Sequence, residues 1–338
     1  MPLLASAGLG LIAGYGAVRL GLRSSMIFGA LAMAVCAAAG AVFPTVPMLL
    51  GARILEGLGY LIVVVAAPTL IAREAARKDV PLALAIWGMF FTLGLSLAAF
   101  AGGALAGPFG WRGWYLSSAG LVAFAAVAAL GSIPKDVAGG ADHPDAPKTR
   151  AAMPVATWLL GAAFLGLTLL SLSILSLLPT FLVQQHGFTP GRAGQVTGSV
   201  ALASIAGSLS YGVLARGLPG SIIAAGVGVA LSVSAFLAFA EAAAPVQIIA
   251  WTAVAVFMSG VLVAQTFAAV PRVAGTLALT GPTNGLVAQL GSVGALAGPP
   301  ALGAVISAAG WRALPFVVAG FALSYAALFI LALRVAHR

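Results

Sequence analysis

Two ionisable side chains inside an apolar stretch are the strongest candidates for chemistry in this chain. Arg53 and Glu56 lie in the apolar run 48–72, and Glu56 is the only acidic residue within any such run. Residues three positions apart share one face of a helix, so the two side chains can pair. Ionisable groups in hydrocarbon are costly and are candidates for function. Arg53 could face a cavity and attract an anion while Glu56 titrates or positions it. Alternatively, Arg53 reaches an interface and Glu56 only neutralises its charge.

Uncharged polar and aromatic residues inside the apolar runs form a second set of candidates. They could line a cavity and contact a solute, or they could hydrogen-bond between helices, an interaction worth about 1 kcal/mol. Serine hydroxyls on a helix more often bond their own backbone. The amide and threonine candidates are Gln265, Thr266, Asn284 and Gln289, the serines are Ser171, Ser173 and Ser176, and the aromatic residues are Tyr60 and Trp87.

Patterns typical of catalysis or metal binding are missing from the sequence. It contains neither a His-Glu-x-x-His pattern nor a phosphate-binding Gly-x-x-x-x-Gly-Lys-Ser/Thr loop. The single cysteine, Cys36, excludes disulfides within the chain and cysteine-based metal sites. The three histidines all lie outside the apolar runs. We therefore expect no catalytic residue, no metal and no cofactor, and we expect that the protein is not an enzyme.

Composition places the candidate residues in lipid. Hydrophobic residues make up 62% of the chain and charged residues 7%, whereas soluble domains have about 25% charged residues. So few charges cannot cover a soluble surface, so the lipid bilayer is the expected solvent. The 43 glycines fit helices that pack closely in lipid. The net charge of +9 is interpreted as basic anchors at the membrane surface and not as a nucleic-acid site.

Eleven apolar runs are long enough to cross a bilayer, which takes about 20 residues of helix. Helices are expected because they satisfy every backbone polar group within one segment. The breaks between the runs are rich in glycine and proline, as turns are. The sequence thus predicts an all-α polytopic bundle. Its spans are 2–18, 24–43, 48–72, 81–107, 113–133, 155–183, 193–215, 219–240, 244–270, 276–308 and 311–333.

The basic residues support this threading. If the break after the first run is cytoplasmic, twelve basic residues fall on the cytoplasmic side and four on the other, in line with the positive-inside rule. This places the C-terminus and the polar linker 134–153 in the cytoplasm. The twelve are Arg19, Arg23, Arg73, Arg77, Lys78, Lys135, Lys148, Arg150, Arg216, Arg272, Arg334 and Arg338, and the four are Arg53, Arg112, Arg192 and Arg312.

The sequence on the two sides of the linker repeats. Gly110-Trp111-Arg112 recurs 200 residues later as Gly310-Trp311-Arg312. Repeats of this kind occur in secondary transporters, which bind solute between the repeats near the middle of the membrane. We therefore divide the chain into an N-terminal helical half, 1–133, the linker 134–153, and a C-terminal helical half, 154–338.

The loop after the first run resembles a signature of the major facilitator superfamily. The stretch that runs from Gly14 through Val18-Arg19 and Gly21 to Arg23 is similar to the family's G-x-x-x-D-R-x-G-x-R between its second and third helices. Val18 replaces the acidic residue, which puts the family's usual charge relay in doubt. The first run therefore corresponds to the family's second helix, and the family's first helix is absent from this sequence. We expect either a start further upstream in the gene or a protein that is short and then inactive or dependent on a partner.

Patterns in two later runs resemble the same family. Arg53 followed by spaced glycines is similar to the fourth-helix pattern, which implies a buried arginine. The run from Gly94 to Gly103 is similar to the fifth-helix antiporter pattern, G-x-x-x-G-P-x-x-G-G, but has alanines in place of its Gly-Pro. The later run from Gly294 through Gly298-Pro299 keeps the Gly-Pro. The resemblance implies that these glycines and the loop signature act in gating.

The resemblance implies a secondary active transporter that works by alternating access. We expect a monomer in the bacterial inner membrane that moves a small organic solute, with Arg53 favouring an anion and a proton as the candidate coupling ion. The sequence texture is loosely similar to the branch of cyanate and nitroimidazole carriers. One alternative is multidrug efflux by proton antiport, which the altered antiporter pattern and the scarcity of intramembrane acids argue against. The other is a truncated membrane protein that transports nothing.

Overall fold

The structure is a computed structural model that describes residues 21–42, 45–76, 78–88, 90–133, 153–239 and 244–336. The regular structure of these residues is helical, as the lengths of the apolar runs predict. The elements are α2 (Leu22–Val42), α3 (Val46–Glu74), α4 (Val80–Gly88), α5 (Phe90–Ser132), α6 (Val155–His186), α7 (Pro190–Ala201), α8 (Ala203–Gly217), α9 (Gly220–Ala238), α10 (Pro245–Ala274), α11 (Leu277–Ala309), the 3-10 turn η1 (Trp311–Ala313) and α12 (Leu314–Ala336).

The expected spans match these helices closely. Within the described ranges, nine helical segments are long and apolar enough to cross a bilayer. The expected span 81–107 corresponds to α4 together with the first part of α5. The expected span 193–215 is divided into α7 and α8 at Leu202, whose backbone dihedrals remain helical, so the two form one bent span. The first run, 2–18, and residues 134–152 of the linker lie outside the described residues.

The repeated Gly-Trp-Arg tripeptides adopt the same turn. Gly110 has φ 64° and ψ −176°, and Gly310 has φ 74° and ψ 176°. This backbone region is open essentially to glycine alone, because a Cβ would clash with the neighbouring peptide. Gly110 bends the chain inside α5, and Gly310 ends α11 before η1 and α12. The tripeptide therefore marks one kind of helix-to-helix corner, used twice, 200 residues apart.

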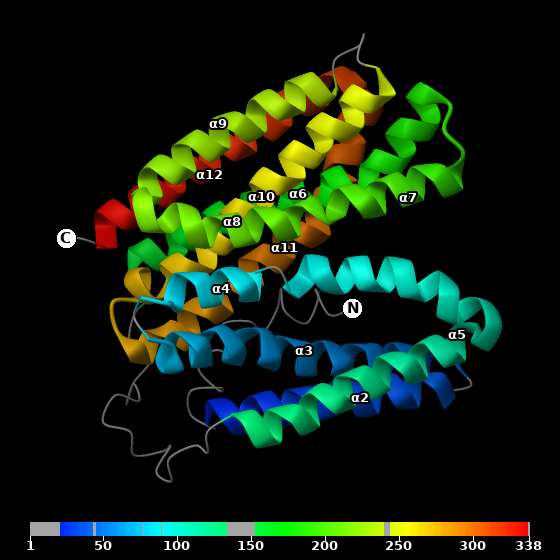
Figure 1. The fold of residues 1–338 in the computed structure, drawn as a ribbon, viewed down its shortest axis with the longest axis vertical. Coiled ribbons are helices and arrows are strands. Elements are labelled where there is room, and N and C mark those ends of the chain that lie inside the picture. The colour runs from blue at the N-terminus through cyan, green and yellow to red at the C-terminus, as the bar shows by residue number, and fades with distance from the viewer. Residues whose placement is uncertain are drawn as a thin grey trace.

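The helices lie roughly along one direction and form two groups (Figure 1). One group contains α2, α3 and the later part of α5, and a small apolar core that includes Leu61 and Val65 joins α2 to α3. The other group contains α6 to α12 around a larger core that includes Leu167, Leu231 and Tyr325. Helix α4 packs mainly on α8 and α10, and α3 also contacts α11, so these contacts connect the groups.

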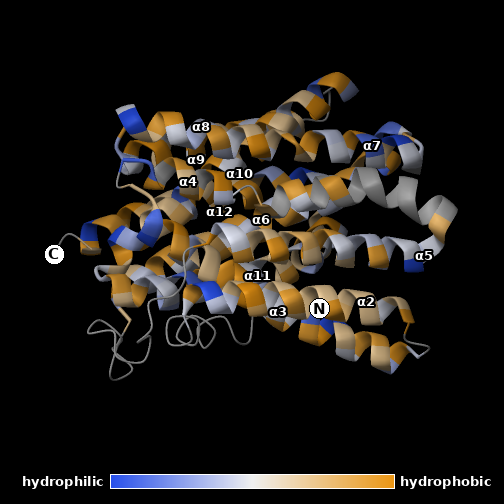
Figure 2. Ribbon diagram, turned by 60° about the horizontal axis from the view of Figure 1, so that its bottom comes forward, coloured by the Kyte–Doolittle hydropathy of each residue, from blue (hydrophilic) through white to orange (hydrophobic). Residues whose placement is uncertain are grey.

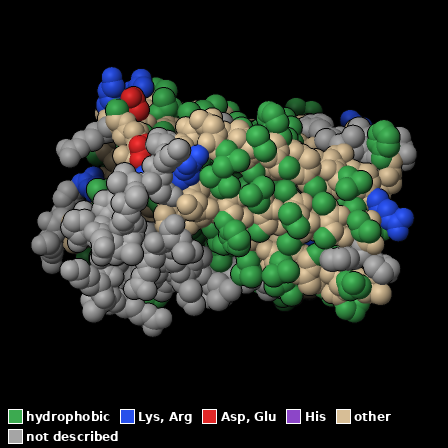
Figure 3. All heavy atoms as spheres, turned by 90° about the horizontal axis from the view of Figure 1, so that it is seen from below, with side chains coloured by type: hydrophobic (Ala, Val, Ile, Leu, Met, Phe, Trp, Pro, Cys, Tyr) green, Lys and Arg blue, Asp and Glu red, His purple; other side chains and the backbone are tan. Residues whose placement is uncertain are grey.

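The surface of the bundle suits lipid. Large apolar side chains such as Phe124, Val213 and Phe316 are exposed, each by more than two thirds. Hydrophobic residues cover most of the helices along their length (Figure 2). On the face drawn in Figure 3, most lysine and arginine atoms lie toward the two ends, and hydrophobic side chains cover the area right of centre between them. This pattern fits a bundle whose middle contacts hydrocarbon and whose ends contact water.

Helices α6 and α11 pack closely because α11 carries glycines where they touch. A Cβ added at Gly294 would collide with the Leu165 carbonyl oxygen, and one added at Gly298 would collide with the Leu169 carbonyl oxygen. Thr168 Oγ1 also donates to the Gly291 carbonyl oxygen over 2.8 Å and links the two helices. Small residues at such crossings let two backbones approach within a bilayer.

We predict that Gly298→Ala destabilises the protein, by about 1–3 kcal/mol as expected for an overpacked core. Gly303→Ala is the matched control on the same helix, because an added Cβ there meets no atom within 4 Å. Alanine is also the better helix former, so the control should be neutral or slightly stabilising. Unfolding temperatures of the two variants in detergent measure the difference, and equal temperatures would contradict the packing described for α11.

Candidate functional site

A cavity of about 950 Å³, its open side included, lies between the two groups of helices. Its wall is formed by the middle of α3, the adjoining ends of α4 and α5, and parts of α6, α8, α10 and α11. On α6 the lining residues Phe164, Thr168, Ser171 and Leu175 follow one another at three- or four-residue spacing, so they form one helix face. The lining is mostly apolar with a few hydroxyl groups, as is common in sites for small organic molecules.

Aromatic rings line the cavity from both groups of helices. Tyr60 of α3 and Phe90 at the start of α5 lie on one side of the sequence linker, with ring centroids 6.4 Å apart. Phe164 of α6 and Phe267 of α10 lie on the other, in an edge-to-face pair with centroids 5.4 Å apart. Trp87 stacks on Phe90 at 4.6 Å and supports that ring. The two ring pairs therefore offer apolar, flat surfaces to one space.

Most of the cavity hydroxyl groups are already engaged by the backbone. Ser259 and Ser292 each donate to the carbonyl oxygen four residues before them, at 3.0 and 2.8 Å, as serines in apolar helices commonly do. Thr168 bonds carbonyl oxygens of both α6 and α11. Ser171 differs, because its buried Oγ has no hydrogen-bond partner among the described residues. Unlike those of Thr168, Ser259 and Ser292, its hydroxyl is thus left for a ligand.

The described residues that line the cavity are all uncharged. The ionisable pair of the sequence analysis lies elsewhere on α3. Arg53 and Glu56 precede Tyr60 by seven and four residues, so they stand on nearly the same face of the helix but closer to its N-terminal end. They are therefore displaced along the helix from the cavity wall by about one to two turns.

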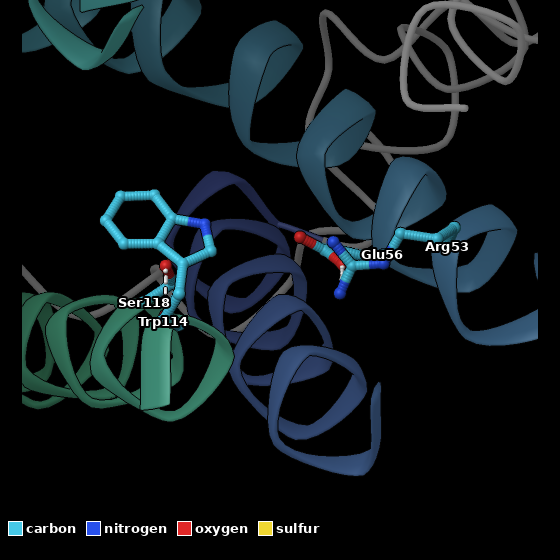
Figure 4. Close-up of polar contacts among 4 residues, drawn as sticks. All are labelled: Arg53, Glu56, Trp114 and Ser118. Carbon is cyan, nitrogen blue, oxygen red and sulfur yellow. Dashed lines mark hydrogen bonds and ion pairs between the residues drawn. The ribbon is translucent and has the colours of Figure 1, made fainter. Parts of the chain in front are cut away.

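Arg53 and Glu56 pair with each other between α3 and its neighbours (Figure 4). Arg53 Nη2 lies 2.5 Å from Glu56 Oε2, and the side chains are 24% and 17% exposed. The guanidinium also lies over the ring of Tyr115 of α5, 4.5 Å from its centroid, a favourable cation–π arrangement. Gly40 of α2 leaves room for this stack, since an added Cβ would lie 2.8 Å from the Tyr115 ring. The pair is thus held by three helices.

The amide candidates and Thr266 do not line the cavity. Gln265 is buried and donates through Nε2 to the Gly220 carbonyl oxygen at 2.6 Å, which joins α10 to α9. Asn284 is buried and donates through Nδ2 to Thr69 Oγ1 at 3.0 Å, which joins α11 to α3. Gln289 is partly buried on α11 and has a partner of its own. Thr266 bonds the Tyr325 hydroxyl at 2.9 Å between α10 and α12. The contacts of Gln265, Asn284 and Thr266 each link two helices.

Of the residues expected to act in gating, some lie at helix ends and some at crossings. Gly21 has φ 91° and directly precedes α2. In the first turn of α2, Arg23 Nη2 donates to the Leu130 carbonyl oxygen of α5 at 2.6 Å. Gly94 is exposed on α5, and Gly103 is part of the same helix. Pro299 follows the close contact at Gly298 on α11. Gly14 and Arg19 lie outside the described residues.

Sequence reasoning missed most of the cavity wall. It named Tyr60 and Ser171 of the wall, and Trp87, which stacks on the wall residue Phe90. It did not name the phenylalanines at 90, 164 and 267 or the hydroxyls at 168, 204, 259 and 292. The helical spacing of Phe164, Thr168 and Ser171 was a usable signal. In a chain where apolar residues surround every helix, however, nothing in the sequence separates a cavity face from a lipid face.

We predict that Arg53→Gln lowers the free energy of unfolding by about 1–3 kcal/mol, between the values for exposed and buried ion pairs. The variant leaves Glu56 as a half-buried charge without its partner. Adding Glu56→Gln should recover part of the loss. Arg73→Gln is the control, because the Arg73–Glu74 pair is 38% and 44% exposed and should change stability little. Unfolding temperatures in detergent are compared for the unchanged protein and the three variants. A double variant less stable than Arg53→Gln would contradict the pairing.

Comparison with known proteins shows which solved structures share this fold. No curated protein matches the chain in sequence. The solved human organic anion transporter TETRAN superposes with a TM-score of 0.78 at 19% identity, covering 97% of this chain and 82% of that one. The Escherichia coli fucose:proton symporter FucP superposes with a TM-score of 0.76 at 16% identity, covering 97% and 87%. At such identities the likeness shows the fold.

The sequence model of the Major Facilitator Superfamily matches residues 1–288. This match covers most of the 338 residues, and the fold agrees with it. The chain therefore belongs to the major facilitator superfamily, and it is a multi-pass membrane protein and a secondary transporter rather than an enzyme.

Proposed function

We propose that the protein carries a small organic solute across the bacterial inner membrane by alternating access, with the cavity as the solute site. The observation that carries the proposal is the position of the cavity. It lies halfway along the helices and is walled by helices of both groups. A movement of one group against the other would change which side of the membrane it faces.

The contact between Thr69 and Asn284 supports such a movement. On α3, Thr69 lies five residues beyond Val64, the last cavity residue of that helix, and on α11, Asn284 lies four residues before Ala288, the first. Both are buried, at 6% and 1% exposure. This hydrogen bond therefore joins the two groups at the end of the bundle that holds Arg73, Arg272 and the end of α12. By the positive-inside rule we assign that end to the cytoplasm.

A small organic anion is a second candidate for the solute. Arg53 stands on the α3 face that reaches the cavity, so an anion on its way to the cavity could meet it. TETRAN, which shares the fold, is described as an organic anion transporter. Glu56, next to Arg53 and well inside α3, is an acid that could bind a coupling proton.

We predict that a cysteine in the cavity is labelled from both sides of the membrane. Leu172→Cys in a Cys36→Ala background places one thiol in the cavity wall. An impermeant thiol reagent should reach it in right-side-out and in inside-out vesicles, because the cavity opens to each side in turn. His186→Cys should react only from outside and Lys148→Cys only from the cytoplasm. Labelling of Leu172→Cys from one side alone would contradict alternating access.

Adding Thr69→Val to the labelled protein removes the hydroxyl that Asn284 contacts and nearly preserves the side chain's shape. One hydrogen bond contributes about 0.5–1.5 kcal/mol net, so cytoplasmic labelling of Leu172→Cys should rise about twofold to tenfold. Thr266→Val is the control, because the Thr266–Tyr325 bond stays within one group of helices. The same rise in both variants would show a general loosening and not the opening of the cytoplasmic end.

A further inference from the structure

The wall of the cavity carries information about the solute, on the assumption that the proposed transport takes place there. Tyr60 and Phe90 come from α3 and α5, and Phe164 and Phe267 come from α6 and α10. The first pair belongs to the sequence before the linker and the second to the sequence after it. A flat ring held between them would contact both groups of helices at once, and aromatic pairs contribute beyond the area that they bury.

The rings are held in place by packing against one another and against neighbouring residues. Trp87 stacks on Phe90 with an angle of 17° between the ring planes. Phe164 packs against Phe267 at 72° and is also buried against Gly291 of α11, where an added Cβ would collide with its ring. The aromatic surfaces are therefore fixed before a ligand arrives, which lowers the entropy lost on binding.

Ser171 adds one polar contact to this apolar wall. Its Oγ is buried and lacks a hydrogen-bond partner among the described residues, and a buried polar atom left without a partner is unfavourable. Ser171 lies on the α6 face that also carries Phe164 and Thr168. A hydrogen-bond acceptor on a ring next to Phe164 would satisfy the hydroxyl.

A full charge is poorly accommodated in the same wall. The lining residues that the structure describes bear no charge, and Arg53 is already engaged by Glu56 and Tyr115. An ion that enters such a space loses its hydration without gaining a counterion, which is strongly unfavourable. The described part of the wall therefore favours a neutral solute over an ion.

From these observations we infer that the solute is a neutral, planar aromatic compound with a hydrogen-bond acceptor. Its ring lies between the Tyr60–Phe90 and Phe164–Phe267 pairs, and its acceptor receives the Ser171 hydroxyl. The inference names the substrate class of the transport proposed above. It replaces the anion that Arg53 alone would favour.

Four compounds with one skeleton test this class on the purified full-length chain in detergent. They are 2-naphthamide, which is neutral and aromatic, 2-naphthoate, 2-naphthylmethylammonium, and the saturated decahydro-2-naphthamide. Ligand that binds the folded state raises the unfolding temperature. We expect 2-naphthamide to give the largest rise, the saturated amide a smaller one, and the two ions little or none. A larger rise with 2-naphthoate, an equal rise with all four, or no rise with any would overturn the inference.

Two variants test whether Ser171 and Phe90 contact the bound 2-naphthamide. Ser171→Ala should weaken binding of 2-naphthamide about threefold to tenfold, the loss of one hydrogen bond. Phe90→Leu should weaken it by a similar factor, about threefold to tenfold, and leave the saturated amide unchanged. Ser210→Ala and Phe124→Leu are matched controls, because Ser210 and Phe124 are exposed and outside the cavity wall. Unchanged affinity in both cavity variants would place the compound elsewhere.

The inferred solute class can be wrong while the proposed transport is right, and the experiments distinguish the two outcomes. Labelling of Leu172→Cys from both sides of the membrane requires no solute, so it can hold while the naphthalene series shows another preference. If 2-naphthoate binds best and the labelling still alternates, the transport proposal stands and the anion takes the place of the neutral compound.

Discussion

The close crossing of α6 and α11 is the contact on which the cavity depends. At Gly294 and Gly298, the backbone of α11 touches carbonyl oxygens of α6, a contact that any larger residue would prevent. The crossing sets the cavity-lining face of α6, from Phe164 to Leu175, beside the face of α11 from Ala288 to Ala295. In hydrocarbon there is little hydrophobic gain from joining two apolar helices. Fit between the two backbones and a few hydrogen bonds must therefore hold the site together.

Polar side chains in this bundle serve two purposes that the structure separates. Those of Gln265, Thr266 and Asn284 bond atoms of a neighbouring helix and are buried. Ser259 and Ser292 line the cavity yet bond their own helix. Several buried hydroxyls of the described residues have no partner, and among them Ser171 is the one whose residue lines the cavity. A polar residue in a membrane helix therefore indicates a ligand contact only when no backbone or neighbouring helix has already satisfied it.

The fold was largely predictable from the sequence and the cavity was not. Run length and backbone satisfaction predicted the helices, and the Gly-Trp-Arg tripeptides marked two turns with matching dihedrals. Asn284 illustrates the limit. Its polarity inside an apolar run predicted a role, but its partner Thr69 is 215 residues away, and no local pattern identifies such a contact. The sequence also does not distinguish the phenylalanines of the wall from those that face lipid, because the exposed Phe124 lies in an equally apolar stretch.

Arg53 and Glu56 lie outside the described cavity wall. Their charges suggest a role in binding solute, but their contacts indicate a structural role. Each alone would be a costly charge in a poorly solvated place. Paired at 2.5 Å and stacked on Tyr115, they compensate each other and join α3 to α5. A solute anion would have to compete with Glu56 for the guanidinium, whereas a neutral ring in the cavity leaves the pair intact. The same pairing that makes Arg53 tolerable within the span thus weakens the case for an anion bound to it.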